Sequence, residues 1–145
     1  MRLLAIFPLL VSAGAHSRQS DEVEVGKILS GFIAAFDNLD WDQFRGFLPT
    51  VFFPRDSPHR ADGREEFERT FQQVFERIRV GRTKGPYMNL NPIDLKIQIA
   101  GDVAIATFHL DDRPGFLNRR TIVLQRGTRG WKIIHLHASE VQTAN

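Results

Sequence analysis

The chain has 145 residues, 42% of them hydrophobic, and its 19 Lys and Arg residues nearly balance its 17 Asp and Glu residues. This length allows one domain with a real core rather than two, and a formal net charge of +2 gives no broad surface for nucleic acid. Because the chain has no cysteine, it can be neither a thiol enzyme nor a lipoprotein anchored through cysteine.

The first 15 residues follow the pattern of a secretory signal peptide. Arg2 gives a positive start, residues 3–11 are almost wholly apolar, and Ala-Gly-Ala at 13–15 fits a cleavage site. The apolar run is shorter than the roughly 20 residues of a membrane-spanning helix. A buried N-terminal helix or strand is the alternative. We therefore expect a secreted or periplasmic protein with no membrane attachment after cleavage, starting near His16 with a flexible segment at 16–21.

The next third of the chain predicts helices. From Glu22, apolar residues recur every three or four positions up to residue 36, as in an amphipathic helix. Asp40 can cap a short second helix that Pro49 closes. A brief β-prone run at 50–53 follows. Gly63 opens a third helix that carries three rings four residues apart, Phe67, Phe71 and Phe75, so the rings form one stripe.

The second half of the chain predicts strands. Residues 91–100 alternate apolar and polar side chains, Gly101 and Asp102 form a tight turn, and extended runs follow at 103–110, 119–125 and 130–139. Helices followed by a four-stranded antiparallel meander predict an α+β fold. Because sheets twist, this one should curve around the N-terminal helices as a half-open cone over residues 22–140, with a tail at 141–145.

Five segments carry a family resemblance: FIAAFD at 32–37, DWD at 40–42, TVFFP at 50–54, GREEF at 63–67 and GWKIIHLH at 130–137. In this order they resemble the nuclear transport factor 2-like superfamily, in its SnoaL-like and ketosteroid-isomerase-like branches. The last segment is also similar to the end of the association domain of calcium/calmodulin-dependent kinase II. The resemblance implies a cystatin-like cone, a scaffold that hosts isomerases, dehydratases, cyclases, binders and assembly hubs.

The catalytic positions of ketosteroid isomerases are apolar in this chain. By the resemblance, the hydroxyl donor falls at Phe32, the general-base carboxylate at Phe53 and the protonated acid near Ile122. Enolisation needs a base and an oxyanion donor in the same apolar cavity. Ketosteroid isomerisation is therefore not expected.

A pocket inside the cone is the expected site. The comparison with the association domain implies that His109 points into it, where that family uses a basic side chain to meet a carboxylate, with Thr107 and Asp111 on the same face. His109 would act as a general base, hold an anion, or simply be a hydrogen-bonded lining residue. Arg120 shares the inward register of Ile122 and could meet an anionic group. The expected ligand-binding residues are Phe32, Phe53, Phe71, Phe75, Leu95, Thr107, His109, Arg120 and Ile122. Complete filling of the cone by the rings is the alternative.

Two histidines, His135 and His137, share one face of the last strand. A zinc site needs at least a third ligand, which the sequence does not offer nearby, so no metal is expected. The resemblance places these histidines with Trp131 on the outer sheet face, which often packs against a second subunit in this superfamily. We therefore expect a homodimer through this face.

Three functions remain open from the sequence. The first is a secreted domain that binds a small apolar or carboxylate-bearing molecule. The second is a cofactor-independent dehydratase, cyclase or hydrolase that uses His109 and Asp111. The third is a dimerising assembly module. No cofactor is expected, because the chain has no glycine-rich phosphate loop.

Overall fold

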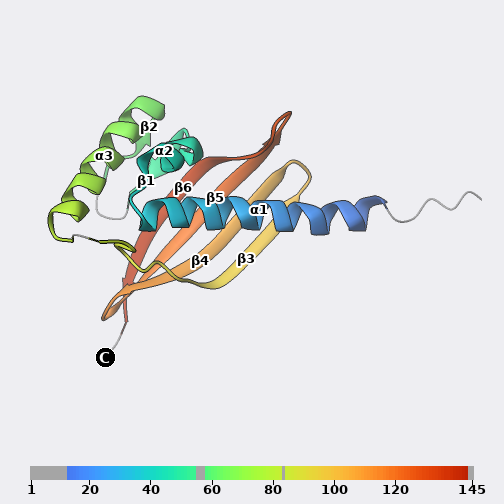
Figure 1. The fold of residues 1–145 in the computed structure, drawn as a ribbon. Helices are drawn as coiled ribbons and strands as arrows, with labels where there is room; N and C mark the ends of the chain where they lie inside the picture. Colours follow the sequence, from blue (N-terminus) through green and yellow to red (C-terminus); the bar gives the residue numbers. More distant parts are fainter. Residues whose placement is uncertain (1–12, 55–57, 83, 144–145) are drawn as a thin grey trace, which may run out of the picture.

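A computed structural model describes residues 13–54, 58–82 and 84–143 of the chain, so the first 12 residues of the predicted signal peptide and the end of the predicted tail lie outside the described residues. The elements of the described part are α1 (Ala13–Asp37), α2 (Trp41–Phe44), the short 3-10 helix η1 (Arg45–Phe47), β1 (Val51–Phe53), β2 (Ala61–Asp62), α3 (Arg64–Val80), β3 (Pro92–Ala100), β4 (Val103–Arg113), β5 (Phe116–Gly127) and β6 (Gly130–Gln142). Helix α1 crosses one face of the sheet, and α2 and α3 gather at the end where β1 and β2 lie (Figure 1). The predicted α+β fold, a curved sheet around N-terminal helices, is confirmed.

The sheet has more strands than the sequence predicts. In the described residues its order is β2-β1-β6-β5-β4-β3. Strands β3 to β6 form the expected antiparallel meander. Strand β1 adds to β6 in parallel, and β2 pairs with β1. The β-prone run before Pro54 therefore belongs to the sheet and ties the chain before α3 to the last strand.

Helix α1 starts earlier than the sequence predicts. It begins at Ala13 rather than at Glu22, so the segment 16–21 is helical. Asp21 is buried and forms an ion pair with Arg126 of β5. The Arg126 guanidinium lies 4.6 Å from the Trp131 ring centroid. The ion pair attaches α1 at Asp21 to β5 of the sheet. None of the helices among the described residues is long and apolar enough to cross a bilayer.

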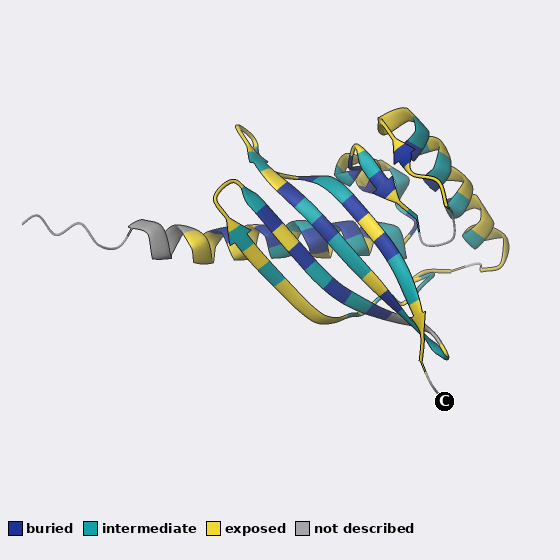
Figure 2. Ribbon diagram, turned by 180° about the vertical axis from the view of Figure 1, so that it is seen from behind, coloured by how far each residue is buried: buried dark blue, intermediate teal, exposed yellow. Residues whose placement is uncertain are grey.

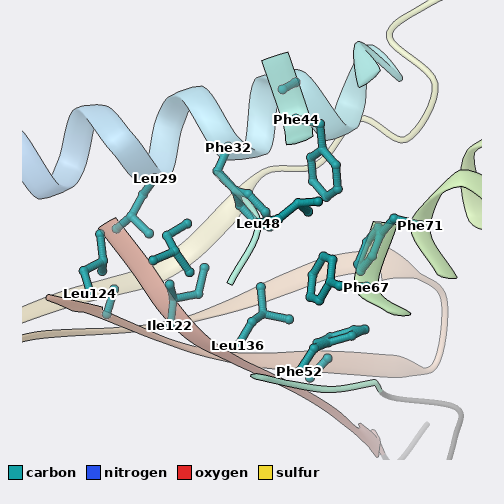
Figure 3. Close-up of a cluster of buried hydrophobic side chains, with 14 of the residues drawn as sticks. Leu29, Phe32, Phe44, Leu48, Phe52, Phe67, Phe71, Ile122, Leu124 and Leu136 are labelled. Atoms are coloured by element: carbon teal, nitrogen blue, oxygen red, sulfur yellow. The ribbon is translucent and has the colours of Figure 1, made fainter. Parts of the chain in front are cut away.

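The core lies between α1 and the sheet face that α1 covers, here called the inner face; the opposite face is the outer face. Leu29 of α1 contacts the region of Ile122 and Leu124 (Figure 3). Ala104 and Ala106 of β4 are fully buried on the same face, and their small side chains let the helix approach the strands.

The predicted aromatic stripe of α3 is confirmed, since Phe67, Phe71 and Phe75 are all buried. It packs against Phe44 of α2, whose ring centroid lies 5.0 Å from those of both Phe71 and Phe75. Phe52 of β1 joins them at 5.2 Å from Phe71. Helix α3 is thus fixed by ring-to-ring contacts at one end of the sheet, as Figure 3 shows.

Strand β6 contains a β-bulge that reverses which side chains face inward. Val123 pairs with His135, whereas the next residue, Leu124, pairs with Ile133, so Ile134 is an extra residue. One extra residue moves every side chain beyond it to the other face. Trp131 and Ile133 therefore lie on the inner face and are buried. The prediction that Trp131 lies on the outer face is wrong, while His135 and His137 do lie there.

Candidate functional site

A cavity of about 620 Å³ lies between α3, the second half of α1 and the inner face of the sheet. Its walls are mainly apolar and come from α1, β1, α3, β4 and β6. The largest apolar side chains of the lining are Phe32, Phe36, Phe52, Phe71 and Phe108. Its polar side chains are His59, Arg60, Glu66, Thr70, Arg77 and Arg120.

The rings form a wall rather than filling the cone, because they stack along the helices. Phe67 and Phe71 of α3 are stacked with centroids 4.6 Å apart, and Phe36 of α1 meets Phe71 edge to face at 5.9 Å. The rings therefore contact one another along the helices. The cavity lies between this layer of rings and Phe108 of β4, so the rings do not fill the cone completely, which was the alternative.

Arg120 is the polar side chain that β5 contributes to the cavity. Its Cα partners are Phe108 of β4 and Ala138 of β6, and all three line the cavity. Arg120 is half-buried, and its Nη1 donates to the Arg119 carbonyl at 3.1 Å. A guanidinium thus stands on an otherwise largely apolar wall.

The polar groups at the start of α3 take part in local hydrogen bonds. The Thr70 hydroxyl donates to the Glu66 carbonyl at 2.9 Å, and the Glu66 carboxylate accepts the Asp62 N–H at 3.1 Å. Glu66 therefore ties β2 to the first turn of α3. The only carboxylate among the described lining residues has a structural partner.

The remaining polar lining residues are exposed at the rim. They are His59, Arg60 and Arg77. The Arg60 Nε donates to Asp62 at 2.8 Å, and this hydrogen bond raises the pKa of Arg60 above its usual value. At the rim, the Arg60 charge is therefore offset by Asp62, and Arg77 is the further arginine of the described lining there.

The structure brings some of the predicted ligand-binding residues to the cavity. Phe32, Phe71 and Arg120 line it. Ile122 and Phe75 face the interior but are 0% and 2% exposed, and both are packed in the core beside the cavity rather than in its lining. The predicted inward register of Arg120 and Ile122 is correct, because no bulge interrupts β5 and β4 between their partners.

His109 and Thr107 lie on the outer face, so the prediction that they point into the pocket is wrong. Their strand neighbours Phe108 and Leu110 line the cavity, and successive side chains alternate between faces. The His109 Nδ1 lies 3.6 Å from a carboxylate oxygen of Asp94 on β3. The side chain of Asp111, the expected catalytic partner, lies outside the described residues.

Phe53 and Leu95 are also outside the cavity. Phe53 is 40% exposed on the outer face, with its ring centroid 5.8 Å from that of His135 and 6.1 Å from that of His137. Its neighbour Phe52 points inward instead. Leu95 is 47% exposed and sits where the pairing of β3 with β4 is irregular. The expectation for Phe53 fails by one residue of register, whereas β3 contributes no residue to the described lining of the cavity.

The sequence reasoning missed the polar lining residues of α3. Glu66, Thr70 and Arg77 are spaced by four and seven residues, so they lie along one side of the helix beside the buried Phe stripe. This spacing was a usable signal. No cluster of three or more potential metal ligands occurs among the residues that the structure describes.

Comparison with known proteins places this geometry in context. The family model described as SnoaL-like domain matches residues 25–143. A search of the curated proteins finds no match. Among solved structures, a protein of the nuclear transport factor 2-like family from Streptomyces avermitilis superimposes with a TM-score of 0.73 at 21% identity, covering 87% of this chain and 99% of that chain.

Two further solved structures agree on the fold. A nuclear transport factor 2-like protein of unknown function from Pseudomonas putida KT2440 has a TM-score of 0.69 at 20% identity over 83% of this chain and 87% of its own. A protein with a cystatin-like fold from Novosphingobium aromaticivorans has a TM-score of 0.68 at 12% identity over 94% of each chain. The predicted cystatin-like cone and the predicted family resemblance are confirmed.

Proposed function

Because this chain belongs to the SnoaL-like domain family, whose folds bind small molecules or act as cofactor-free enzymes, we propose that its cavity binds a small, predominantly apolar molecule. The observation that carries the proposal is the 620 Å³ cavity behind the phenylalanine layer. Ligand sites are typically concave, mostly apolar and roughly 300–1,000 Å³ in volume. The signal-like residues 1–15 support the further proposal that binding takes place after secretion.

Binding without turnover is favoured over catalysis. A general base must lie within hydrogen-bond reach of the proton that it removes. His109, the expected base, faces away from the cavity, Glu66 already accepts a backbone N–H, and His59 is exposed at the rim rather than inside the cavity. The cavity wall therefore supports recognition better than it supports acid–base chemistry.

A thermal-shift panel on the full chain tests the proposal. The probes are progesterone, dodecanol and 3-phenylpropanol, with mass spectrometry of the recovered compounds to detect turnover. A ligand that prefers the native state raises its stability by mass action, so at least one probe should raise Tm and be recovered unchanged.

A matched pair of variants locates the binding. Ala138→Phe places a ring into the cavity wall, whereas Ser139→Phe places the same ring on the outer face. The first should abolish the shift in Tm and the second should leave it. The proposal fails if no probe stabilises the wild type, or if both variants bind equally well.

We also propose that the outer face forms a homodimer. Across the four strands β1, β6, β5 and β4, two neighbouring cross-strand rows on this face carry no Lys, Arg, Asp or Glu; charged residues stand only at their edges, Asp62 of β2 beside Val51 and Lys96 of β3 beside Thr107. The rows consist of Val51, His135, Val123 and Ile105, and of Phe53, His137, Thr121 and Thr107. Interface centres are depleted of charged residues and enriched in aromatic ones. Figure 2 views the sheet from this side, with exposed and half-buried residues interleaved along the strands.

A further inference from the structure

The lining of the cavity changes from apolar to polar with decreasing burial. The buried residues of the described lining, here called the floor, are all apolar, and the larger of them are Phe32, Phe52, Phe71, Phe108, Leu110 and Leu136. The polar residues Glu66, Thr70 and Arg120 are only half-buried, and the polar residues of the rim are exposed. Polar groups of the described lining therefore surround the outer part of the cavity and not its floor.

The half-buried polar side chains already have partners within the chain. The Thr70 hydroxyl donates to the Glu66 carbonyl, and the Glu66 carboxylate accepts the Asp62 N–H. Arg120 donates to the Arg119 carbonyl and has a further interaction within the chain. A charged group of a ligand that reached the floor would lose its water without gaining a partner there, which is costly. The floor therefore favours the apolar part of a ligand.

Arg77 is placed differently, because it is exposed at the rim. It forms no hydrogen bond or ion pair with the residues that the structure describes, whereas Arg60 of the rim is paired with Asp62. A negatively charged group that stays in water at the rim can therefore meet Arg77. Because water screens an exposed ion pair, this contact should raise affinity by no more than about 5-fold.

We infer that the ligand is an amphiphile with a single apolar tail, which enters the cavity tail first and leaves its head group in water at the rim, with a modest preference for an anionic head at Arg77. The inference rests on the proposed function and names its ligand class and orientation. The tail lies against the floor, and its burial supplies most of the affinity. Because the head stays hydrated, its size and chemistry should matter little.

Probes that differ from one another at one end test this orientation. Calorimetric titration of the full chain compares dodecanoate with dodecanedioate, which carries a second carboxylate at the tail end, and with N-dodecanoylglycine, which has a larger head. Dodecanedioate should bind at least about 30-fold more weakly than dodecanoate, because one carboxylate would have to lie against the floor. N-Dodecanoylglycine should bind within about 5-fold of dodecanoate, because its larger head stays in water.

Variants of α3 test the contact of the head group with Arg77. Arg77→Met should lower the affinity for dodecanoate by up to about 5-fold and leave that for dodecanol unchanged, because only the charged head meets the guanidinium. Arg69→Met is the matched control, since Arg69 is exposed on the same helix and lies outside the described lining. It should leave both affinities unchanged.

The outcomes separate the inference from the proposed function. Dodecanedioate that binds as tightly as dodecanoate overturns the inference, and so does N-dodecanoylglycine that fails to bind where dodecanoate binds. A fall of 10-fold or more in the ratio of dodecanoate to dodecanol affinity in Arg120→Met would place the carboxylate inside the cavity and also overturn it. In each of these cases a cavity that binds apolar molecules remains. Absence of binding by these probes and by the thermal-shift panel alike overturns the proposed function, and the inference with it.

Discussion

Arg126 joins two parts of the chain that are far apart in the sequence. It pairs with the buried Asp21 of α1 and lies over the ring of Trp131. Removing one partner of a buried ion pair leaves an uncompensated charge, which costs more than the pair itself contributes. Arg126→Met should therefore lower the free energy of unfolding by about 2–4 kcal/mol in urea titrations. Arg129→Met, in the exposed adjoining turn, should change it by less than about 0.5 kcal/mol.

A second variant distinguishes loss of the pair from loss of packing. If the unpaired carboxylate is the cause, the double variant Asp21→Asn with Arg126→Met should be more stable than Arg126→Met alone, because no buried charge is left. A double variant that is less stable would contradict this account.

Phe52 and Phe53 are adjacent residues with opposite roles. Phe52 is 6% exposed and packs 5.1 Å from the Phe67 ring centroid, whereas Phe53 is 40% exposed. Phe52→Ala should destabilise the fold by about 3–5 kcal/mol, as expected when a buried ring leaves a cavity. Phe53→Ala should cost less than about 1 kcal/mol. Chemical denaturation of both variants at equal low concentration measures the difference, and similar losses would mean that the register of β1 is wrong.

The helices could be predicted from the sequence more fully than the strands, and the reason is register. A helical stripe such as Phe67, Phe71 and Phe75 tolerates small errors, since its period places several residues near one face. A strand alternates strictly, so one extra residue reverses every assignment. Ile133 and Ile134 are both aliphatic, and nothing in the sequence marks Ile134 as the residue of the bulge.

The errors at the candidate site follow from the same ambiguity. Strand β4 has apolar residues on both faces, so alternation alone could not decide whether Phe108 or His109 faces inward. Arg120 was placed correctly because Ile122 fixed the inward register of β5. A pocket inside the cone was expected, but its size and its lining residues could not be predicted, because they depend on how closely α3 approaches the sheet.

Helix α2 is too short to be stable without its cap. Asp40 accepts the Gln43 N–H at 3.1 Å and the Gln43 side-chain amide at 2.8 Å, as the sequence predicts for an N-cap residue. Asp40→Ala should lower the free energy of unfolding by about 1 kcal/mol. Asp42→Ala, two residues further on in the first turn and exposed, is the control and should cost less, as urea titrations would show. A larger loss in the control would point to the helix dipole rather than to capping.

At the scale of the whole molecule, the proposed binding cavity and the proposed dimer surface lie on opposite faces of the sheet. The inner face and α3 enclose the cavity, whereas the uncharged rows lie on the outer face. Because the sheet stands between them, assembly through one face need not close the other. Dimerisation and ligand binding should therefore be separable by substitution.

Ile105 offers the test of that separation. It lies in one of the uncharged rows and is 37% exposed. In sedimentation experiments the wild type should be dimeric at micromolar concentration. Ile105→Glu should raise the dimer dissociation constant at least about 10-fold, because the interface would then bury two carboxylates, one from each subunit. Val80→Glu makes the same kind of change on α3, away from this face, at a side chain that is 89% exposed, and it should leave the dimer unchanged.

The monomeric variant should still be stabilised by the probes that stabilise the wild type. A wild type that stays monomeric at all concentrations would contradict the dimer, and loss of probe binding together with dimerisation would contradict the independence of the two faces.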